Sequence, residues 1–252
     1  MLRSRPRRPE IGAQILSVFD HVFIINLKSR ADRRREMREQ LELVGLSADH
    51  PAISFFDAVR PDAPGGWPSI GARGAFMSHL GVLSRARDMG LQRILVLEDD
   101  VDWTRSFLMH GPAALERLEG DEWGIVHGGL RQATKGQGDE AISLESVPAD
   151  TELLLAHFLG FSGDTIARAE AYLKAITARP AGDAAGGPMH VDGAYSWFRR
   201  DNPDIATWIC DPAIAVQRAS RTDIHELRWF DRFRGTSDLV RFCRSVSNKL
   251  RF

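Results

Sequence analysis

The sequence RILVLEDD, residues 93–100, joins four apolar residues to three consecutive carboxylates, Glu98, Asp99 and Asp100. An uninterrupted apolar run of this kind is typical of a strand that a parallel sheet buries on both faces. A fourth carboxylate, Asp102, follows two positions later. Because burying adjacent negative charges without a partner is costly or forces them to take up protons, we expect a cation beside this acid cluster.

Strand and helix patterns alternate on both sides of this segment. The predicted strands, which are short and apolar, are residues 22–27, 52–59, 93–100, 123–129, 143–147, 152–161 and part of 208–217. The predicted helices, which carry apolar residues at helical spacing, are 28–46, 73–89, 113–118, 163–180 and 237–252, with a helix or turn at 190–200. This alternation predicts an α/β fold with a mostly parallel central sheet flanked by helices.

The composition sets limits on the class of protein. With 252 residues, 43% of them hydrophobic, the chain can bury the core of one large domain or two small ones. A formal net charge of −1 gives no reason to expect a nucleic-acid partner. Two cysteines, Cys210 and Cys243, are too few for a disulfide framework. No run approaches the roughly 20 apolar residues of a membrane span, and we expect no export signal.

The acid cluster is suited to binding a metal. Ligands of open α/β sheets bind at the carboxyl ends of the strands, where these residues lie. Because side chains alternate along a strand, Glu98, Asp100 and Asp102 are expected on one side and Asp99 on the other. Carboxylates on one side can chelate Mg²⁺ or Mn²⁺ and leave coordination positions for phosphate oxygens. The alternative is a solvated strand end whose acids pair with neighbouring arginines.

Three segments together resemble glycosyltransferase family 25. They are INLKSRADRRREM (25–37), GARGAFMSHLGVLSRA (71–86) and ILVLEDDV (94–101), in the order and approximate spacing of that family. The family includes bacterial lipooligosaccharide galactosyltransferases and collagen galactosyltransferase domains, and this sequence looks like a bacterial-type member. Weaker likeness extends the resemblance to about residues 20–225.

The resemblance implies a GT-A-like nucleotide-sugar-binding fold and a divalent cofactor, Mn²⁺ or Mg²⁺, held by the acidic, DXD-type motif. It implies inverting transfer of a sugar, commonly galactose, from a UDP-sugar to a saccharide or glycolipid acceptor, as in lipopolysaccharide biosynthesis. A metal that bridges the diphosphate neutralises charge on the leaving group, and binding both substrates supplies their orientation.

The donor is expected at the end of the first strand. In the family this edge receives the uridine nucleotide, which here places it at Ile25, Asn26 and Leu27. Arg30 and Arg33 begin the following helix, where their planar guanidinium groups suit phosphate oxygens. A solvated helix face is an equal alternative for Arg30.

The family's Ser-His pair corresponds to Ser78 and His79. We expect His79 to face the donor pocket or to orient the acidic strand by hydrogen bonding. The alternative is a histidine that belongs to the hydrophobic core. Gly71 and Gly74 are expected to allow close backbone approach.

The resemblance also supports a metal set and a general base. The expected metal ligands are Glu98, Asp100 and Asp102, with Asp99 on the nucleotide side. An inverting transfer needs a base within hydrogen-bond reach of the acceptor hydroxyl. We assign this role to Asp192, which follows a flexible Ala/Gly linker and matches a family aspartate. A helix cap is an equal alternative for Asp192, and His190 is a competing base.

We expect three parts in the chain. Residues 1–19 are a basic N-terminal extension, 20–226 the GT-A-like domain and 227–252 a basic amphipathic segment. The last segment is suited either to contact with an anionic membrane surface or to docking on the domain. The expected location is the cytoplasm, free or peripheral on the inner face of the cytoplasmic membrane.

Two other interpretations stay open. A phospho-receiver domain also has an apolar strand that ends in Mg²⁺-binding acids, but it places that strand at its start. It also needs a later phospho-accepting Asp and a Lys, which do not follow Asp100 at suitable spacing. The second interpretation is a non-catalytic nucleotide- or glycan-binding relative. Acceptor choice is expected to depend on the loops at 61–71 and 131–140.

Overall fold

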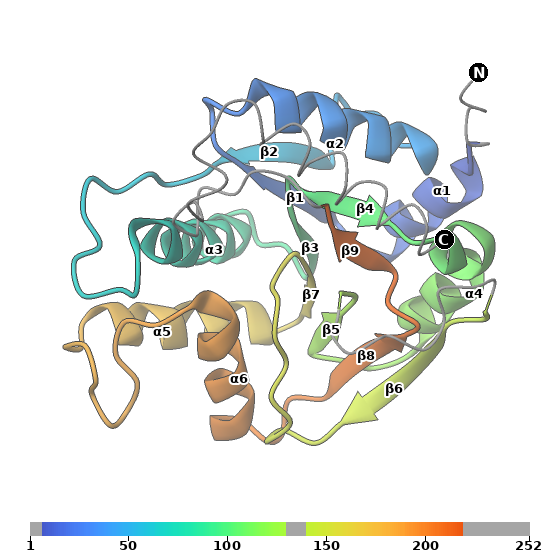
Figure 1. The fold of residues 1–252 in the computed structure, drawn as a ribbon. Coiled ribbons are helices and arrows are strands. Elements are labelled where there is room, and N and C mark those ends of the chain that lie inside the picture. The colour runs from blue at the N-terminus through green and yellow to red at the C-terminus, as the bar shows by residue number, and fades with distance from the viewer. Residues whose placement is uncertain (1–6, 130–139, 219–252) are drawn as a thin grey trace.

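The computed structural model describes residues 7–129 and 140–218, which form one mixed sheet with helices on both faces (Figure 1). The sheet has seven strands in the order β2-β1-β3-β7-β5-β8-β6. Five of them run in the same direction, and β7 and β6 run in the opposite direction. The expected α/β class, with a mostly parallel central sheet flanked by helices, is confirmed.

The strands of the sheet, from one edge to the other, are β2 (Ile53–Asp57), β1 (His21–Asn26), β3 (Arg93–Glu98), β7 (Phe158–Ser162), β5 (Ile125–His127), β8 (Thr207–Asp211) and β6 (Ser143–Val147). A separate two-stranded ladder pairs β4 (Val101–Trp103) with β9 (Ala215–Gln217). The helices are α1 (Pro9–Val18), α2 (Ala31–Leu43), α3 (Ile70–Asp88), α4 (Arg105–Gly120), α5 (Thr165–Thr177) and α6 (Val191–Asp201).

The sheet separates two hydrophobic layers. Helices α1, α2 and α4 pack against one face, and α3, α5 and α6 against the other (Figure 1). Strand β3 serves both layers, because Leu95 and Leu97 belong to the first and Ile94 and Val96 to the second. The alternation of side chains continues past the apolar run. Glu98 is therefore directed to the side of α3, and Asp99 to the side of α2.

Helix α4 is longer than the apolar pattern predicts. The expected helix covered residues 113–118, whereas α4 covers Arg105–Gly120 and contains Pro112. Proline normally interrupts a helix because it lacks an N–H group. Here the hydroxyl of Thr104 accepts a hydrogen bond from the backbone N–H of Phe107, and buried residues on both sides of Pro112 hold the helix against the core.

Strand β7 is shorter than expected. The apolar segment 152–161 predicted one strand, but only its second half enters β7. Leu155, between the two halves, has a φ of 74°, which a strand cannot contain. The segment therefore enters the sheet at Phe158 and runs antiparallel to β3 and β5.

Residues 1–19 were expected to form a basic extension that precedes the domain. Within residues 1–19, however, α1 contributes Ile11, Ile15 and Val18 to the core. The basic segment 227–252, its expected helix and residues 131–139 of the polar loop lie outside the described residues. No helix in the described part of the chain has the length and hydropathy needed to cross a bilayer.

Leu97 gives a test of the central role of β3. Leu97→Ala should lower the free energy of unfolding by about 2–5 kcal/mol, because the side chain is 1% exposed and its loss leaves a cavity. Leu154→Ala is the matched control: Leu154 is 36% exposed, and its truncation should change stability by less than about 1 kcal/mol. Urea unfolding measures both, and equal losses would contradict this account of the core.

Candidate functional site

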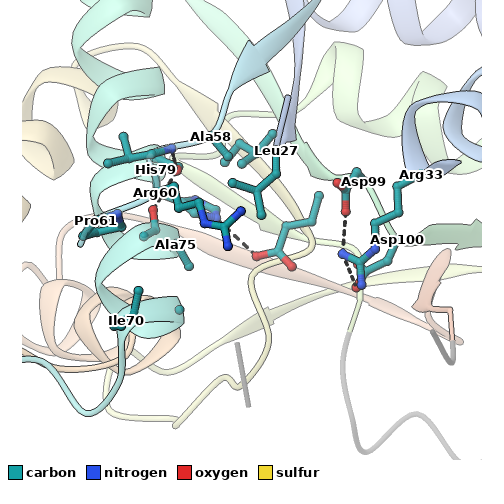
Figure 2. Close-up of a pocket in the computed structure, with 16 residues that line it drawn as sticks. Leu27, Arg33, Ala58, Arg60, Pro61, Ile70, Ala75, His79, Asp99 and Asp100 are labelled. Carbon is teal, nitrogen blue, oxygen red and sulfur yellow. Dashed lines mark hydrogen bonds and ion pairs between the residues drawn. The ribbon is translucent and has the colours of Figure 1, made fainter. Parts of the chain in front are cut away.

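A pocket of about 320 Å³ opens where β1 and β3 end, between α2 and α3. Figure 2 shows Arg33, Asp99 and Asp100 together on one side of it, and Pro61, Ile70 and Ala75 on the other. Eight of the predicted donor-binding and metal-binding residues line this pocket, together with the two glycines expected at a close approach, Gly71 and Gly74: the eight are Ile25, Leu27, Arg33, Ser78, His79, Glu98, Asp99 and Asp100. Eight residues chosen from three separate segments of the sequence thus meet at one place.

Asp99 is tied to the first strand and the first helix that follows it. Its Oδ1 pairs with Nη1 of Arg33 at 2.7 Å, and its Oδ2 accepts a hydrogen bond from Nδ2 of Asn26 at 2.7 Å. Burial raises the pKa of Asp99, and the charge of Arg33 opposes that rise. Asn26 does not line the pocket. It supports the pocket indirectly: its Nδ2 holds Asp99, and its Oδ1 accepts a hydrogen bond from Nε of Arg34 on α2.

Asp100 is only partly neutralised. Nη1 of Arg33 lies 3.7 Å from its Oδ2, while its Oδ1 is buried and has no hydrogen-bond partner among the described residues. Burial, and after it the negative charge of Glu98, raise the pKa of Asp100 to about 7. A cation placed against this oxygen would relieve both effects.

Glu98 lies on the side of β3 opposite to Asp99, as the alternation of side chains along a strand requires. Its Oε1 is 3.5 Å from Nε2 of His79, and its Oε2 accepts a hydrogen bond from Nε2 of Gln217 at 3.3 Å. Burial alone would raise the pKa of Glu98, but the neighbouring imidazoles of His79 and His157 bring it below its usual range. Glu98 is therefore a carboxylate that stays ionised although only 14% of its side chain is exposed.

Ser78 fixes the opposite wall of the pocket. Its hydroxyl donates to the carbonyl of Gly74 at 2.6 Å and accepts from the backbone N–H of Val59 at 2.9 Å. These bonds hold α3 against the connection that follows β2. A Cβ at Gly74 would lie 2.7 Å from the carbonyl oxygen of Val59, so the expected close backbone approach at this glycine is confirmed.

Asp102 faces away from the pocket. The Nε and Nη2 atoms of Arg218 donate to its Oδ1 at 2.9 and 2.7 Å, and the backbone N–H of Arg218 donates to the carbonyl of Asp100 at 2.6 Å. The chain turns at residues 99–100, and β4 then pairs with β9, which carries Asp102 to Arg218. Within residues 7–129 and 140–218, no group of three His, Cys, Asp or Glu side chains is arranged to hold a metal. The candidate ligands in the pocket are Glu98 and Asp100.

Arg30 and Asp192 also lie outside the lining of this pocket. Arg30 donates to both oxygens of Asp32, at 3.0 and 2.9 Å, and this bond lowers the pKa of Asp32 to about 2. The Oδ2 of Asp192 accepts a hydrogen bond from the backbone N–H of Leu155, the residue with positive φ. Asp192 borders a separate cavity of about 10 Å³, so its assignment as the general base stays a prediction.

The wall that follows β2 was expected only in part: the loop at 61–71 was assigned to acceptor choice, but residues 58–60 were not assigned to the site. This segment supplies Ala58, Val59, Arg60 and Pro61 to the pocket, and Ile70 faces them from the start of α3. Val59 and Ile70 are 39% and 44% exposed, although both are large and apolar. The available signal was position: the end of β2 lies at the same sheet edge as the ends of β1 and β3.

Taken together, the chain is an α/β protein with an acid-edged pocket at the carboxyl ends of its central strands. No family model matches it. About half of the chain is similar to curated proteins named "Glycosyltransferase 25 family member". The one from Drosophila pseudoobscura pseudoobscura is 28% identical over 130 residues, which is 45% of this chain and 21% of the relative. The one from Anopheles gambiae is 28% identical over 131 residues, 44% of this chain and 22% of the relative.

Other relatives carry a different description. The human protein named "Inactive glycosyltransferase 25 family member 3" is 27% identical over 148 residues, 52% of this chain and 24% of the relative. A solved structure titled "crystal structure of a glycosyltransferase involved in the glycosylation of the major capsid of PBCV-1" has a TM-score of 0.41 and 10% identity, over 80% of this chain and 94% of that one.

The resemblance to glycosyltransferase family 25 is confirmed, and this chain is related to members of that family over about half of its length. The matched regions span about a fifth to a quarter of the length of these curated relatives.

Arg33 gives a test of the ion pair at the pocket. Arg33→Met should lower the free energy of unfolding by about 3 kcal/mol, because it leaves the buried Asp99 without its charge partner. Arg38→Met is the control on the same helix: Arg38 pairs with Asp49 in solvent, and its loss should cost less than about 1 kcal/mol. Urea unfolding at neutral pH measures both. A loss at Arg33 no larger than the loss at Arg38 would show that the pair does not stabilise the fold.

Proposed function

We propose that this chain is a metal-dependent inverting glycosyltransferase. It moves a sugar, galactose, from a UDP-sugar to a saccharide or glycolipid acceptor in the synthesis of lipopolysaccharide or another cell-surface glycan. The observation that carries the proposal is that Glu98 and Asp100 edge the same pocket as Arg33 and His79, in a chain related to glycosyltransferases. The family likeness supports galactose and a cytoplasmic location.

The residues at the pocket fit a hard divalent cation. Glu98 is an ionised carboxylate, and Asp100 has a buried oxygen without a hydrogen-bond partner in the described chain. Carboxylate oxygens are the ligands that Mg²⁺ and Mn²⁺ prefer, and these ions commonly complete their coordination with water and phosphate oxygens. Held by Glu98 and Asp100, Mn²⁺ or Mg²⁺ would neutralise charge that develops on a diphosphate leaving group.

The rest of the pocket suits a nucleoside diphosphate. Val59, Pro61 and Ile70 offer an apolar surface to a base or ribose, and most ligand pockets combine such walls with a few polar groups. Arg33 lies beside the acids, and Arg60 also lines the pocket. Guanidinium groups suit phosphate oxygens because they donate in a planar, bidentate geometry. The donor is therefore proposed to lie between α2 and α3.

Asp192 is proposed as the base that takes the proton of the acceptor hydroxyl. It lies on α6, the helix that also carries Tyr195, and Tyr195 contacts His79 of the pocket. An acceptor that reaches Asp192 would approach from the side of α6. His190, the N-cap residue of α6, is the local alternative.

A second candidate function is nucleotide or glycan binding without transfer. Two observations favour it: several relatives, including the human one, are named inactive, and the described residues hold no group of three potential metal ligands. Such a protein would bind a UDP-sugar without consuming it. Metal-dependent hydrolysis or transfer of the donor separates the two functions.

A thermal-shift screen tests the donor and the metal together. UDP-galactose with Mn²⁺ should raise the midpoint of thermal unfolding by about 5 °C at saturating concentrations, because a ligand that binds only the folded state stabilises it. Other UDP-sugars, UDP-galactose without Mn²⁺ and Mn²⁺ alone are the comparisons. If no nucleotide sugar produces a metal-dependent shift, the proposed donor site is wrong.

Two matched substitutions test which carboxylates hold the metal. Asp100→Asn removes a pocket oxygen and should abolish Mn²⁺-dependent hydrolysis of the donor. Asp102→Asn should retain that activity, because Asp102 faces Arg218, while lowering the free energy of unfolding by about 1 kcal/mol. Product formation and urea unfolding are the measurements. The assignment fails if Asp102→Asn loses the metal dependence and Asp100→Asn keeps it.

A further inference from the structure

Tyr195 is a buried phenol beside the pocket for which the proposed function gives no role. It is 6% exposed, and its ring packs against that of Phe161 with 5.4 Å between the centroids. Burial raises the pKa of Tyr195, as does the negative charge of Glu98, so the hydroxyl keeps its proton. Within the described part of the chain, its polar partner is one atom, Nδ1 of His79, at 3.3 Å.

This contact decides which nitrogen of His79 carries the proton. A buried hydroxyl proton that finds no acceptor costs about 1–3 kcal/mol, so Tyr195 donates and Nδ1 accepts. A neutral imidazole has one donor nitrogen and one acceptor nitrogen. In the neutral ring the proton of His79 therefore lies on Nε2, which is buried, forms no close hydrogen bond within the described chain and has Oε1 of Glu98 at 3.5 Å.

The opposite tautomer is disfavoured at both ends. With the proton on Nδ1, two donors would meet between His79 and Tyr195 unless the hydroxyl turned away into an apolar environment. At the other end, the lone pair of Nε2 would face the carboxylate oxygen of Glu98. Both contacts are repulsive. His79 and Tyr195 are buried, at 1% and 6% exposure, so water screens the contact between them little.

We propose that Tyr195 is a positioning residue for Glu98. By donating to Nδ1, it holds His79 in the tautomer whose Nε2–H faces Glu98, and so fixes the carboxylate at the pocket. Gln217 holds the other oxygen of Glu98, which is thus restrained from α3 and from β9. The consequence of this positioning for metal binding rests on the proposed function, in which Glu98 is a metal ligand.

The first test reads the tautomer directly in the metal-free protein. Long-range ¹H–¹⁵N spectra at about pH 8, above the usual pKa of histidine, distinguish a ring protonated on Nε2 from one protonated on Nδ1. His79→Gln assigns the signals by their loss. The wild type should show the Nε2–H form at His79. Tyr195→Phe, which keeps the ring and removes the hydroxyl, should show a measurably larger share of the Nδ1–H form, because Glu98 alone then opposes it.

The chain contains its own matched control. It has two tyrosines, and the hydroxyl of the other, Tyr172, donates to Asp201 at 2.6 Å outside the pocket. Tyr172→Phe should leave the His79 spectrum unchanged. Wild-type protein with the proton of His79 on Nδ1 would overturn the inference without any variant, as would a Tyr195→Phe spectrum identical to that of the wild type.

The second test reads the consequence at Glu98. Tyr195→Phe should weaken Mn²⁺ binding about tenfold in a titration followed by water proton relaxation, since partners that orient a metal ligand typically contribute that much. Tyr172→Phe should bind as the wild type does. In a His79→Gln background the glutamine side chain has no tautomers, and its amide can donate to Glu98 whether or not Tyr195 is present. Tyr195→Phe should therefore cause no further loss of Mn²⁺ affinity in that background.

The two tests distinguish a failure of the positioning role of Tyr195 from a failure of the proposed metal site. If the wild type binds no Mn²⁺, the proposed metal site is wrong, while the tautomer spectra still decide what Tyr195 does to His79. If Mn²⁺ binds and Tyr195→Phe binds it with unchanged affinity, positioning by Tyr195 is wrong and the metal site stands. Circular dichroism confirms that each variant is folded.

Discussion

The guanidinium group of Arg33 faces both carboxylates of the acid turn, Asp99 and Asp100. Arg33 reaches Asp99 at 2.7 Å and Asp100 at 3.7 Å, and its side chain is 11% exposed. Adjacent carboxylates in a buried environment repel one another, and one arginine offsets only part of their charge. The raised pKa of Asp100 is the sign of that remaining imbalance. The same imbalance that limits stability makes the turn a place where a further cation is favoured.

Much of the fold is visible in the sequence because its central elements have strong local patterns. The strands β2 and β3 and the helices α2 and α5 fall within their expected ranges, β1 is shifted by one residue, and α3 begins three residues earlier than expected. The full length of α4 was hidden because Pro112 interrupts the local pattern and tertiary packing compensates. The direction of β7 was hidden as well, since an apolar run is equally suited to a parallel and an antiparallel neighbour.

The site residues also differ in how far the sequence could predict their positions. Glu98 could be placed at the pocket because the ends of neighbouring strands share one edge of the sheet, whereas Asn26 and His79 were assigned from the family resemblance. Interactions with partners that are remote in sequence could not be predicted. Arg218 removes Asp102 from the pocket across 116 residues, and Leu155 engages Asp192 through a backbone N–H that no side-chain pattern reveals.

The pleat of β3 distributes the acids between two helices. Glu98 shares the face of Ile94 and Val96 and meets the imidazole on α3, whereas Asp99 turns to the guanidinium on α2. Loss or gain of one residue within the strand would exchange these partners and invert both hydrophobic layers at once. Relatives that keep this chemistry should therefore vary β3 by substitution and confine changes of length to the connections around it.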